Sequence, residues 1–467
     1  MLTLLFAASA LAAEGNFLPA ETSVLDRALS LVGLGAMIGI AWLLSEHRKE
    51  IDWRPVMWGV GLQIVFGAVI LSPTVSGVFY TVVDGAVNKL LSFANDGATF
   101  VFASIVPHAI IVGDASNAPQ MVSGVSPPMM TFAFWVLPTI IFFSSLMSVL
   151  YHLGVMQVVV KAIAWVMVRT LGTSGAESLS AAGNIFVGQT EAPLLVKPFI
   201  KDMTRSELMA VMTGGFATVA GGVMGAYVSF LHTIPNIAGH LVMASILSAP
   251  AALACAKVMV PELGEPKTRG VVAISGEKPA SNVLEAAAMG AKEGMELAIN
   301  VAAMIIAIVG LVSMFDWFVG LAPVSFCSGI PTTAAACVTG EVEPLSLSIM
   351  LGWVFAPIAV LMGVPLGEAL VVGRLLGEKI VLTEFVAYIN LGALINGPEA
   401  VLSERSSIIA SYALCGFANF ASIGIQLGGI GGLAPNKMPE LASLGLRAMT
   451  AGVLAACMTG CIAGIFL

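Results

Sequence analysis

The sequence predicts an all-α polytopic membrane protein with about eight transmembrane helices, two inverted re-entrant hairpins and interfacial helices. Three observations predict it: a charge-poor composition, long uncharged stretches, and a motif that occurs twice in opposite orientations. Of the 467 residues, 58% are hydrophobic and 10% are charged, whereas a soluble domain carries about 25% charged residues. The composition therefore excludes an ordinary water-soluble enzyme, and the 49 glycines suit helices that pack closely in lipid.

Long uncharged stretches mark the helices that cross the membrane. A spanning helix needs about 20 apolar residues. Residues 208–256 contain no Asp, Glu, Lys or Arg, which leaves room for two spans joined by a turn at 232–236. The other predicted spans lie at 28–45, 55–72, 131–150, 297–322, 406–434 and 448–467.

Lysine and arginine set the orientation, because cytoplasmic connections carry an excess of both. The connections 47–54, 152–205 and 257–293 are basic, whereas 232–238 and 323–345 contain neither residue. Basic and bare connections alternate as eight crossings require, with both termini outside the cytoplasm.

The first 13 residues, MLTLLFAASALAA, are apolar, too short to span a bilayer, and end in small residues. They fit a signal peptide or an N-terminal interfacial segment, and the sequence leaves both open. Cys327 and Cys337 fall in a bare outer connection, where a disulfide and two free thiols are equally compatible with the sequence. The six cysteines show no metal-ligand spacing, and the absence of a basic tract argues against a nucleic-acid partner.

Two polar segments interrupt the apolar pattern: NIFVGQTEAP at 184–193 and LTEFVAY at 382–388. Each has half-length apolar arms, which predicts re-entrant hairpins at about 176–200 and 367–395. Non-helical backbone at this depth is tolerated only where it is buried in protein or lines a wet cavity.

A similar string follows each hairpin: GFATVAG at 215–221 and GFANFAS at 416–422. In the predicted topology the first hairpin follows an inner connection and the second an outer one, so the two copies are inverted. Inverted repeats with interrupted helices are typical of secondary transporters, which bind their substrate at the repeat interface.

Glu191 and Glu384 lie at the two predicted tips. A carboxylate in the bilayer costs several kcal/mol unless it faces water, a partner or a ligand, so both are candidate ligand-binding groups. The alternative role is to cap exposed backbone N–H groups. Asn419 and Ser422 are three residues apart and share a helix face, which makes them candidate ligand contacts near the second tip.

Asn184, together with backbone carbonyls near Val187, Thr218 and Val219, offers a small cage of oxygen atoms suited to a hard monovalent cation. Capping of the first hairpin arm by Asn184 is the alternative. The glycine-rich run 424–432 is no nucleotide loop, because no strand precedes it; glycines at every fourth position predict close helix packing instead.

These features divide the chain into five parts. Residues 1–13 form the signal or interfacial segment, 28–150 the scaffold helices, and 151–260 the first repeat. Residues 261–345 hold a cytoplasmic connection, a scaffold helix and an outer connection, and 346–467 form the second repeat.

Three motifs resemble the concentrative nucleoside transporters: GNIFVGQTEAPLLVKPFI at 183–200, TEFVAY at 383–388 and ALCGFANFASIGIQLGGIGGLAPN at 413–436. Weaker similarity covers 28–467. The resemblance implies a bacterial homotrimer whose protomers transport independently, with a scaffold and a mobile part that carries both hairpins.

The resemblance also implies residue roles. The nucleobase would contact Gln189, Thr190 and Glu191, with Val223 beside it. The ribose hydroxyls would contact Glu384, Asn419 and Ser422, and Phe417 would line the pocket. Sodium would bind Asn184, Val187, Thr218 and Val219. Thr383 departs from the Asn that relatives often carry before the second Glu, which leaves the hydrogen bonding around that carboxylate open.

The sequence therefore predicts a symporter that imports nucleosides across the bacterial inner membrane by alternating access, without a cofactor and without enzymatic activity. Asn184 and Thr218 favour sodium as the coupling ion, with a proton as the alternative. A membrane hydrolase that uses Glu191 and Glu384 as acid and base, and a passive channel, are the remaining alternatives. Purine or pyrimidine preference is not encoded in any motif.

Overall fold

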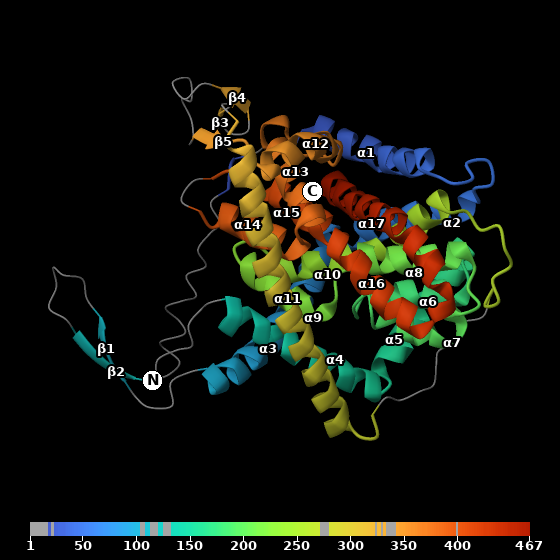
Figure 1. Ribbon diagram of the computed structural model, residues 1–467, viewed down its shortest axis with the longest axis horizontal. Coiled ribbons are helices and arrows are strands. Elements are labelled where there is room, and N and C mark those ends of the chain that lie inside the picture. The colour runs from blue at the N-terminus through green and yellow to red at the C-terminus, as the bar shows by residue number, and fades with distance from the viewer. Residues whose placement is uncertain are drawn as a thin grey trace.

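The structure is a computed structural model that describes residues 17–19, 23–102, 108–112, 120–124, 132–270, 280–322, 325–327, 330–332, 342–397 and 400–467. The predicted N-terminal segment 1–13 and Cys337 lie outside these residues. The described chain is nearly all helical (Figure 1).

The helices of the first half are α1 (Val24–Leu43), α2 (Trp53–Ile70), α3 (Pro73–Phe102), α4 (Leu137–His152), α5 (Val155–Leu171), α6 (Gly175–Asn184), α7 (Lys197–Ile200), α8 (Arg205–Ala217), α9 (Gly221–Phe230) and α10 (Ile237–Met259). Those of the second half are α11 (Val283–Val319), α12 (Leu347–Leu361), α13 (Leu366–Val381), α14 (Glu384–Ile395), α15 (Glu404–Leu414), α16 (Phe420–Leu433) and α17 (Met438–Phe466). Short π- or 3₁₀-turns are η1 (Phe132–Val136), η2 (Ala192–Val196) and η4 (Pro435–Lys437).

Six helical segments of the described chain are long and apolar enough to cross a membrane, or eight if each of two bent pairs counts as one span. The bent pairs are α4 with α5, at 79°, and α12 with α13, at 120°. This range includes the eight crossings that the sequence predicts.

Two predicted spans are broken rather than continuous. The first of the two spans predicted within 208–256 breaks between α8 and α9, where Thr218 adopts an extended backbone with φ −115° and ψ 159°. The predicted span 406–434 breaks between α15 and α16, where Gly416 has φ +112°, a conformation that favours glycine. A Cβ at Gly416 would lie 2.6 Å from the carbonyl oxygen of Phe216, so the two breaks abut one another.

Both predicted hairpins are present. The first consists of α6, a turn over residues 185–191, η2 and α7; the second consists of α13 and α14, joined at Leu382 and Thr383. Local sequence explains where the arms start: Ser174 and Glu177 form a reciprocal capping box at α6, and the Thr383 hydroxyl accepts from the backbone N–H of Val386 at the start of α14.

The core lies around α8, α10 and α17, whose residues are mostly buried. Helix α1 packs on α17, and α2 packs on α10, whereas α11 packs on α4. Gly33 of α1 lies close to two helices, since a Cβ there would clash with the Leu361 carbonyl at the end of α12 and lie 3.2 Å from Cys461 Sγ of α17. The 37-residue α11 is about 55 Å long at 1.5 Å per residue and runs along the outside of the bundle (Figure 1).

The long connections hold two small antiparallel sheets that the sequence did not predict. In the first, β1 (His108–Val112) pairs with β2 (Gln120–Gly124), so that His108 lies opposite Gly124. In the second, β3 (Ser325–Cys327) lies between β4 (Ile330–Thr332) and β5 (Val342–Pro344). The pair β1 and β2 stands apart from the helices (Figure 1).

The glycines at every fourth position of α16 were predicted to pack closely against another helix, and this prediction is wrong. A Cβ at Gly424, Gly428 or Gly432 would meet no described atom within 4 Å. Contact comes instead through Gly429, which faces Thr190, and Gly431, which faces Met438. The repeat therefore lies on an open face of the described chain, and the packed face is offset from it.

Candidate functional site

The two hairpin tips meet at the start of α16. From the first tip, Gln189 donates from Nε2 to the Ser422 hydroxyl at 3.2 Å. From the second, Glu384 accepts from Asn419 Nδ2 at 2.9 Å. Asn419 is the N-cap of α16, and its Oδ1 accepts from the backbone N–H of Ser422 at 2.8 Å. One helix terminus thus joins residues that are far apart in the sequence.

Glu384 is buried at the first turn of α14. Besides Asn419, its carboxylate accepts from the Tyr227 hydroxyl at 3.1 Å. Tyr227 lies on α9, and its ring stacks on Tyr388 of the second hairpin at a centroid distance of 4.2 Å. A helix N-terminus favours a negative charge, so the carboxylate lies where both the backbone and the side chains stabilise it.

The first tip presents amide, hydroxyl and carboxylate groups. Gln189 is buried, and its Oε1 accepts from Gln426 Nε2 at 3.0 Å. Thr190 lies against α16, since a Cβ at Gly429 would be 2.9 Å from its Cγ2. Glu191 differs from Glu384 in being exposed. Its carboxylate folds back over Gly188, where a Cβ would clash with Glu191 Oε2.

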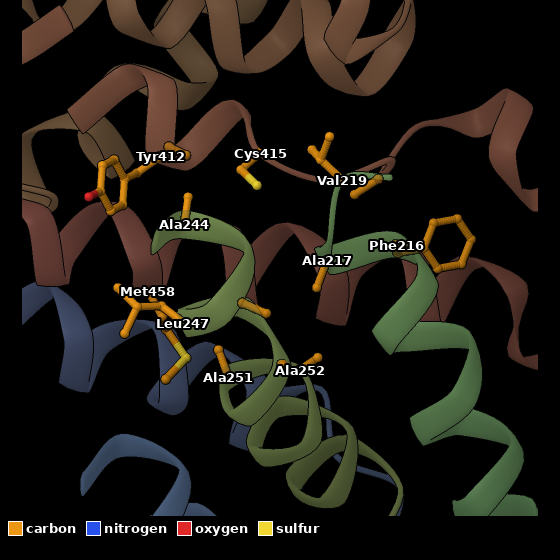
Figure 2. Packing of buried hydrophobic residues seen from close by; sticks show 14 of the residues in the cluster. Phe216, Ala217, Val219, Ala244, Leu247, Ala251, Ala252, Tyr412, Cys415 and Met458 are labelled. Atoms are coloured by element: carbon orange, nitrogen blue, oxygen red, sulfur yellow. The ribbon is translucent and has the colours of Figure 1, made fainter. Parts of the chain in front are cut away.

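Two apolar candidates flank these polar groups. Val223 is buried in the third position of α9, one helical turn before Tyr227. Phe417 is partly buried in the α15–α16 break and packs against the core. Figure 2 shows the neighbouring parts of the two breaks, with Ala217 and Val219 on one side and Cys415 on the other, above the small residues of α10. The breaks of both repeats therefore border one densely packed region.

The candidate cation-binding residues lie together at the α8–α9 break. The first hairpin turn is tied to this break, because the Gly221 N–H donates to the Phe186 carbonyl at 3.0 Å. The Thr218 hydroxyl donates to the Gly214 carbonyl at 2.8 Å. Asn184 is 1% exposed, and a Cβ at Gly214 would be 3.2 Å from its Nδ2.

Neither side-chain atom of Asn184 has a hydrogen-bond partner among the described residues. Buried amides are almost always hydrogen-bonded, so this orphaned amide fits the role of an oxygen ligand to a cation. Val187 follows in the same turn, and Val219 is buried in the break itself. Amide, hydroxyl and carbonyl oxygens are the donor set that a hard cation prefers.

Three residues that contact the site were not predicted. Gln426 was detectable, because it follows Ser422 by one helical turn and shares its face. Tyr227 carried a weaker signal, as a hydroxyl within a charge-free stretch. Lys379 donates from Nζ to the carbonyls of Ala413 and Cys415; only the folded chain brings it to the second break.

A helical chain with apolar helices long enough to span a membrane, in which two hairpins meet at a pair of broken helices, has the architecture of a secondary transporter. Comparison with known families agrees over most of the chain. Residues 32–105 match the family described as "Na+ dependent nucleoside transporter N-terminus", 133–234 match "Nucleoside recognition", and 240–464 match "Na+ dependent nucleoside transporter C-terminus".

Similar proteins include other transporters. An uncharacterized transporter of Haemophilus influenzae is 41% identical over 94% of this chain and 97% of its own length. Sodium/nucleoside cotransporter 1 of Rattus norvegicus is 38% identical over 94% of this chain, which spans 64% of that longer protein.

Solved structures of CNTnw are similar in fold. The inward-facing substrate-bound state is 38% identical, with a TM-score of 0.78 over 94% of this chain and 97% of that one. An outward-facing variant of CNTnw gives a TM-score of 0.80 over 95% of this chain and 98% of that one. The chain belongs to the Na+-dependent (concentrative) nucleoside transporter family. It is therefore a transporter and not an enzyme, and the predicted fold class and family resemblance are confirmed.

Proposed function

We propose that this protein imports nucleosides together with Na+ across the bacterial inner membrane by alternating access. The observation that carries the proposal is the buried carboxylate of Glu384, which accepts from Asn419 at the start of α16, where Gln189 of the first hairpin tip donates to Ser422. A solute bound at this junction would contact both repeats at once, which is the location that alternating access requires.

The ribose contacts follow from the chemistry of Glu384. Its carboxylate accepts from two neutral donors, Tyr227 and Asn419, and ribose hydroxyls can take over such bonds. A site built around a buried acceptor rejects analogues that lack the matching donor, because the acceptor is then left unpaired. We therefore expect deoxyribose analogues that lack the contacted hydroxyl to compete poorly.

The nucleobase contacts are assigned to the first tip. Gln189, Thr190 and Glu191 supply donors and acceptors that can match a base edge, with Val223 and Phe417 as apolar walls. Gln189 now bonds to Ser422 and Gln426, so base binding would exchange internal hydrogen bonds for bonds to the solute. Such an exchange orients the base without leaving unpaired polar groups.

Sodium is assigned to Asn184, Val187, Thr218 and Val219. The set supplies amide, hydroxyl and carbonyl oxygens and contains no side chain that gains or loses a proton near neutral pH, which favours Na+ over H+ as its ligand. Because the ion would tie the first hairpin to the α8–α9 break, it would order the same hairpin that holds the base. Ion binding and solute binding would then be coupled through one element.

The assembly and its moving parts are also proposals. Helix α11 exposes large apolar side chains, including Ile306, Leu311 and Trp317 at 76%, 59% and 63%, and such a face suits lipid or the other subunits of a homotrimer. Helices α4 and α11 pack on each other and would form the static scaffold of the transporter. Both chain termini would lie in the periplasm. The repeats, 151–260 and 346–467, would move, and α1 and α2 are packed against them.

The test is uptake of labelled nucleosides into proteoliposomes under an imposed Na+ gradient, compared with a pH gradient, in competition with a panel of purine, pyrimidine and deoxy analogues. We expect Na+-driven accumulation above the outside concentration. Accumulation driven by the pH gradient alone would assign proton coupling, and equilibration without accumulation would indicate a passive channel.

Glu384→Gln tests the assigned carboxylate. We expect uridine uptake to fall by about tenfold or more, while the yield of folded protein changes little. Glu378→Gln is the matched control: it lies on the same hairpin, and its carboxylate accepts from Ser348 at 2.9 Å and from Asn390 at 2.8 Å and from no residue of α16. Equal loss of uptake and of folded protein in Glu384→Gln would mean that the carboxylate serves the fold alone.

A further inference from the structure

One tyrosine of the first repeat reaches the carboxylate of the second hairpin. Tyr227 of α9 is fully buried, and its hydroxyl donates to Glu384 Oε1 at 3.1 Å. The other carboxylate oxygen, Oε2, accepts from Asn419 at 2.9 Å. The two oxygens of the assigned ribose-binding carboxylate are therefore held by residues of different repeats.

The ring of Tyr227 packs against the second arm of that hairpin, α14. It stacks on Tyr388 at a centroid distance of 4.2 Å and an interplanar angle of 19°, and it meets Phe385 edge-on at 5.5 Å. About one turn further along α9, Phe230 meets the same Phe385 ring at 5.4 Å. Aromatic pairs of this kind stabilise beyond the area that they bury, so this side of α9 is attached along α14.

The other end of α9 begins at the assigned sodium site. Thr218 and Val219 lie just before the helix in the α8–α9 break. The first residue of the helix, Gly221, donates from its N–H to the Phe186 carbonyl of the first hairpin turn at 3.0 Å. From Gly221 to Tyr227 the helix rises only about 9 Å at 1.5 Å per residue. Because rigid secondary elements can carry coupling between two sites, α9 is placed to connect the sodium site with the ribose carboxylate.

We propose that Tyr227 is a positioning residue that couples the two ligands: sodium fixes the start of α9, and α9, through Tyr227, holds Glu384 for the ribose hydroxyls. This route crosses from one repeat to the other, whereas coupling through the first hairpin concerns the base. The Asn419 bond is the one that a ribose hydroxyl takes over, because Asn419 is itself an assigned ribose contact. The Tyr227 bond stays, because its ring is packed on α14. The inference rests on the proposed function, since it presupposes sodium at the break and ribose at the carboxylate.

A simpler role for the hydroxyl is to satisfy a buried carboxylate whatever the ion does. The two roles differ in their sodium dependence. If Tyr227 only satisfies Glu384, loss of the hydroxyl changes the uridine affinity by the same factor at every sodium concentration. If Tyr227 transmits the position of α9, the loss weakens uridine binding most at saturating sodium. Linkage then requires an equal decrease in the effect of uridine on sodium affinity.

The test variant is Tyr227→Phe, which keeps the stacked ring and removes only the hydroxyl. Uridine binding to the purified full-length protein is measured over a NaCl series, with the ionic strength held constant by choline chloride. At saturating NaCl we expect the dissociation constant of the variant to be about tenfold above that of the parent, and at low NaCl the two should approach each other. Tyr388→Phe is the matched control. The Tyr388 hydroxyl belongs to the same stacked pair and is equally buried, but it donates to the Ser411 carbonyl at 2.7 Å, so its loss should leave the sodium dependence unchanged.

Three outcomes would overturn the inference: a Tyr227→Phe curve that overlays the parent curve, a dissociation constant raised by one factor at every NaCl concentration, or an equal loss of sodium dependence in Tyr388→Phe. Failure of the parent to bind uridine in a sodium-dependent way would instead overturn the proposed function.

If Tyr227→Phe does not fold, Gly221→Ala tests the other end of α9. A Cβ at Gly221 would lie 2.9 Å from the Phe186 carbonyl oxygen, so the start of α9 has to move away from the hairpin turn while the Tyr227 hydroxyl is kept. We expect the ratio of the uridine dissociation constants at low and at saturating NaCl to fall severalfold, and an unchanged ratio would sink the proposal.

Discussion

Asn184 has a fully buried amide whose nitrogen and oxygen find no hydrogen-bond partner among the described residues. An unpaired buried polar group costs about 1–3 kcal/mol. The neighbouring Thr218 hydroxyl is already used as a donor to Gly214, so its oxygen lone pairs remain available to a cation. The amide that lacks a protein partner is thus one whose oxygen a bound cation would satisfy.

Thr218→Val tests whether the Thr218 hydroxyl is a ligand of the sodium ion. Removal of an oxygen ligand should raise the sodium concentration for half-maximal uridine uptake by about tenfold, with a smaller effect at saturating sodium. Thr459→Val is the matched control, because the Thr459 hydroxyl is also buried and donates to a helix carbonyl, that of Ala456, at 2.7 Å. A parallel shift in both variants, or none in Thr218→Val, would remove Thr218 from the ion site.

Residues of the site could be predicted where polarity conflicts with an apolar setting. Gln189, Glu384, Asn419 and Ser422 fall in that class, and the structure brings them together. Tyr227 could not be predicted with equal force, since tyrosine is common in membrane helices and its partner is on the other repeat. The exposure of Glu191 also had no sequence signal, because its motif resembles that around Glu384.

At the scale of elements, each hairpin is anchored where its first arm begins. In the first repeat, Ser174 donates to Glu207 of α8 at 2.6 Å, and Lys257 of α10 pairs with Glu177 at 2.7 Å. In the second, the Ser403 hydroxyl at the start of α15 donates to Glu368 of α13 at 2.9 Å. Both clusters join a hairpin to the broken helix that follows it, so each hairpin and its break form one unit.

Lys257→Met tests the first anchor. The ammonium is buried between Glu177 and Glu262, the latter at 3.3 Å, and loss of one partner of a buried pair costs about 3–5 kcal/mol. We expect a clear drop in melting temperature and in folded yield. Lys267→Met removes an exposed pair with Asp202 at 3.1 Å and should cost at most about 1 kcal/mol. Similar effects of the two substitutions would contradict a specific anchoring role.

The elements themselves were predictable to different degrees. Hairpin limits of 176–200 and 367–395 agree closely with the arms from Gly175 to Ile200 and from Leu366 to Ile395, because polar tips within short apolar arms are visible in the sequence. The breaks after α8 and α15 were not predicted. Thr218 and Gly416 are small and nearly neutral in hydropathy, so a span remains apolar on average even where its helix ends.

At the scale of the whole molecule, the turn between α1 and α2 joins several parts of the chain. Glu46 of this turn pairs with Arg205 at the start of α8 at 2.8 Å and with Arg447 of α17 at 3.3 Å. Its backbone N–H donates to the Met259 carbonyl at the end of α10 at 3.0 Å. The N-terminal helices and both repeats therefore share one polar junction, on the side that the basic connections assign to the cytoplasm.

This junction should make stability depend on pH in one direction. The hydrogen bond from Arg205, with the charges of Arg205 and Arg447, lowers the pKa of the Glu46 carboxyl below its usual 4.5. A lowered folded-state pKa adds stability at pH values above the unfolded pKa, and this stability is lost as the pH falls through the folded value. Thermal unfolding of the parent and of Glu46→Gln should therefore differ at pH 7, by about 1 kcal/mol or less for so accessible a pair, and the two should converge as the pH falls below the folded-state pKa of Glu46. Glu50→Gln, which removes an exposed carboxylate of the same turn, is the control for the loss of a surface charge. A difference that persists or grows in acid would show that Glu46 acts through packing and not through its charge.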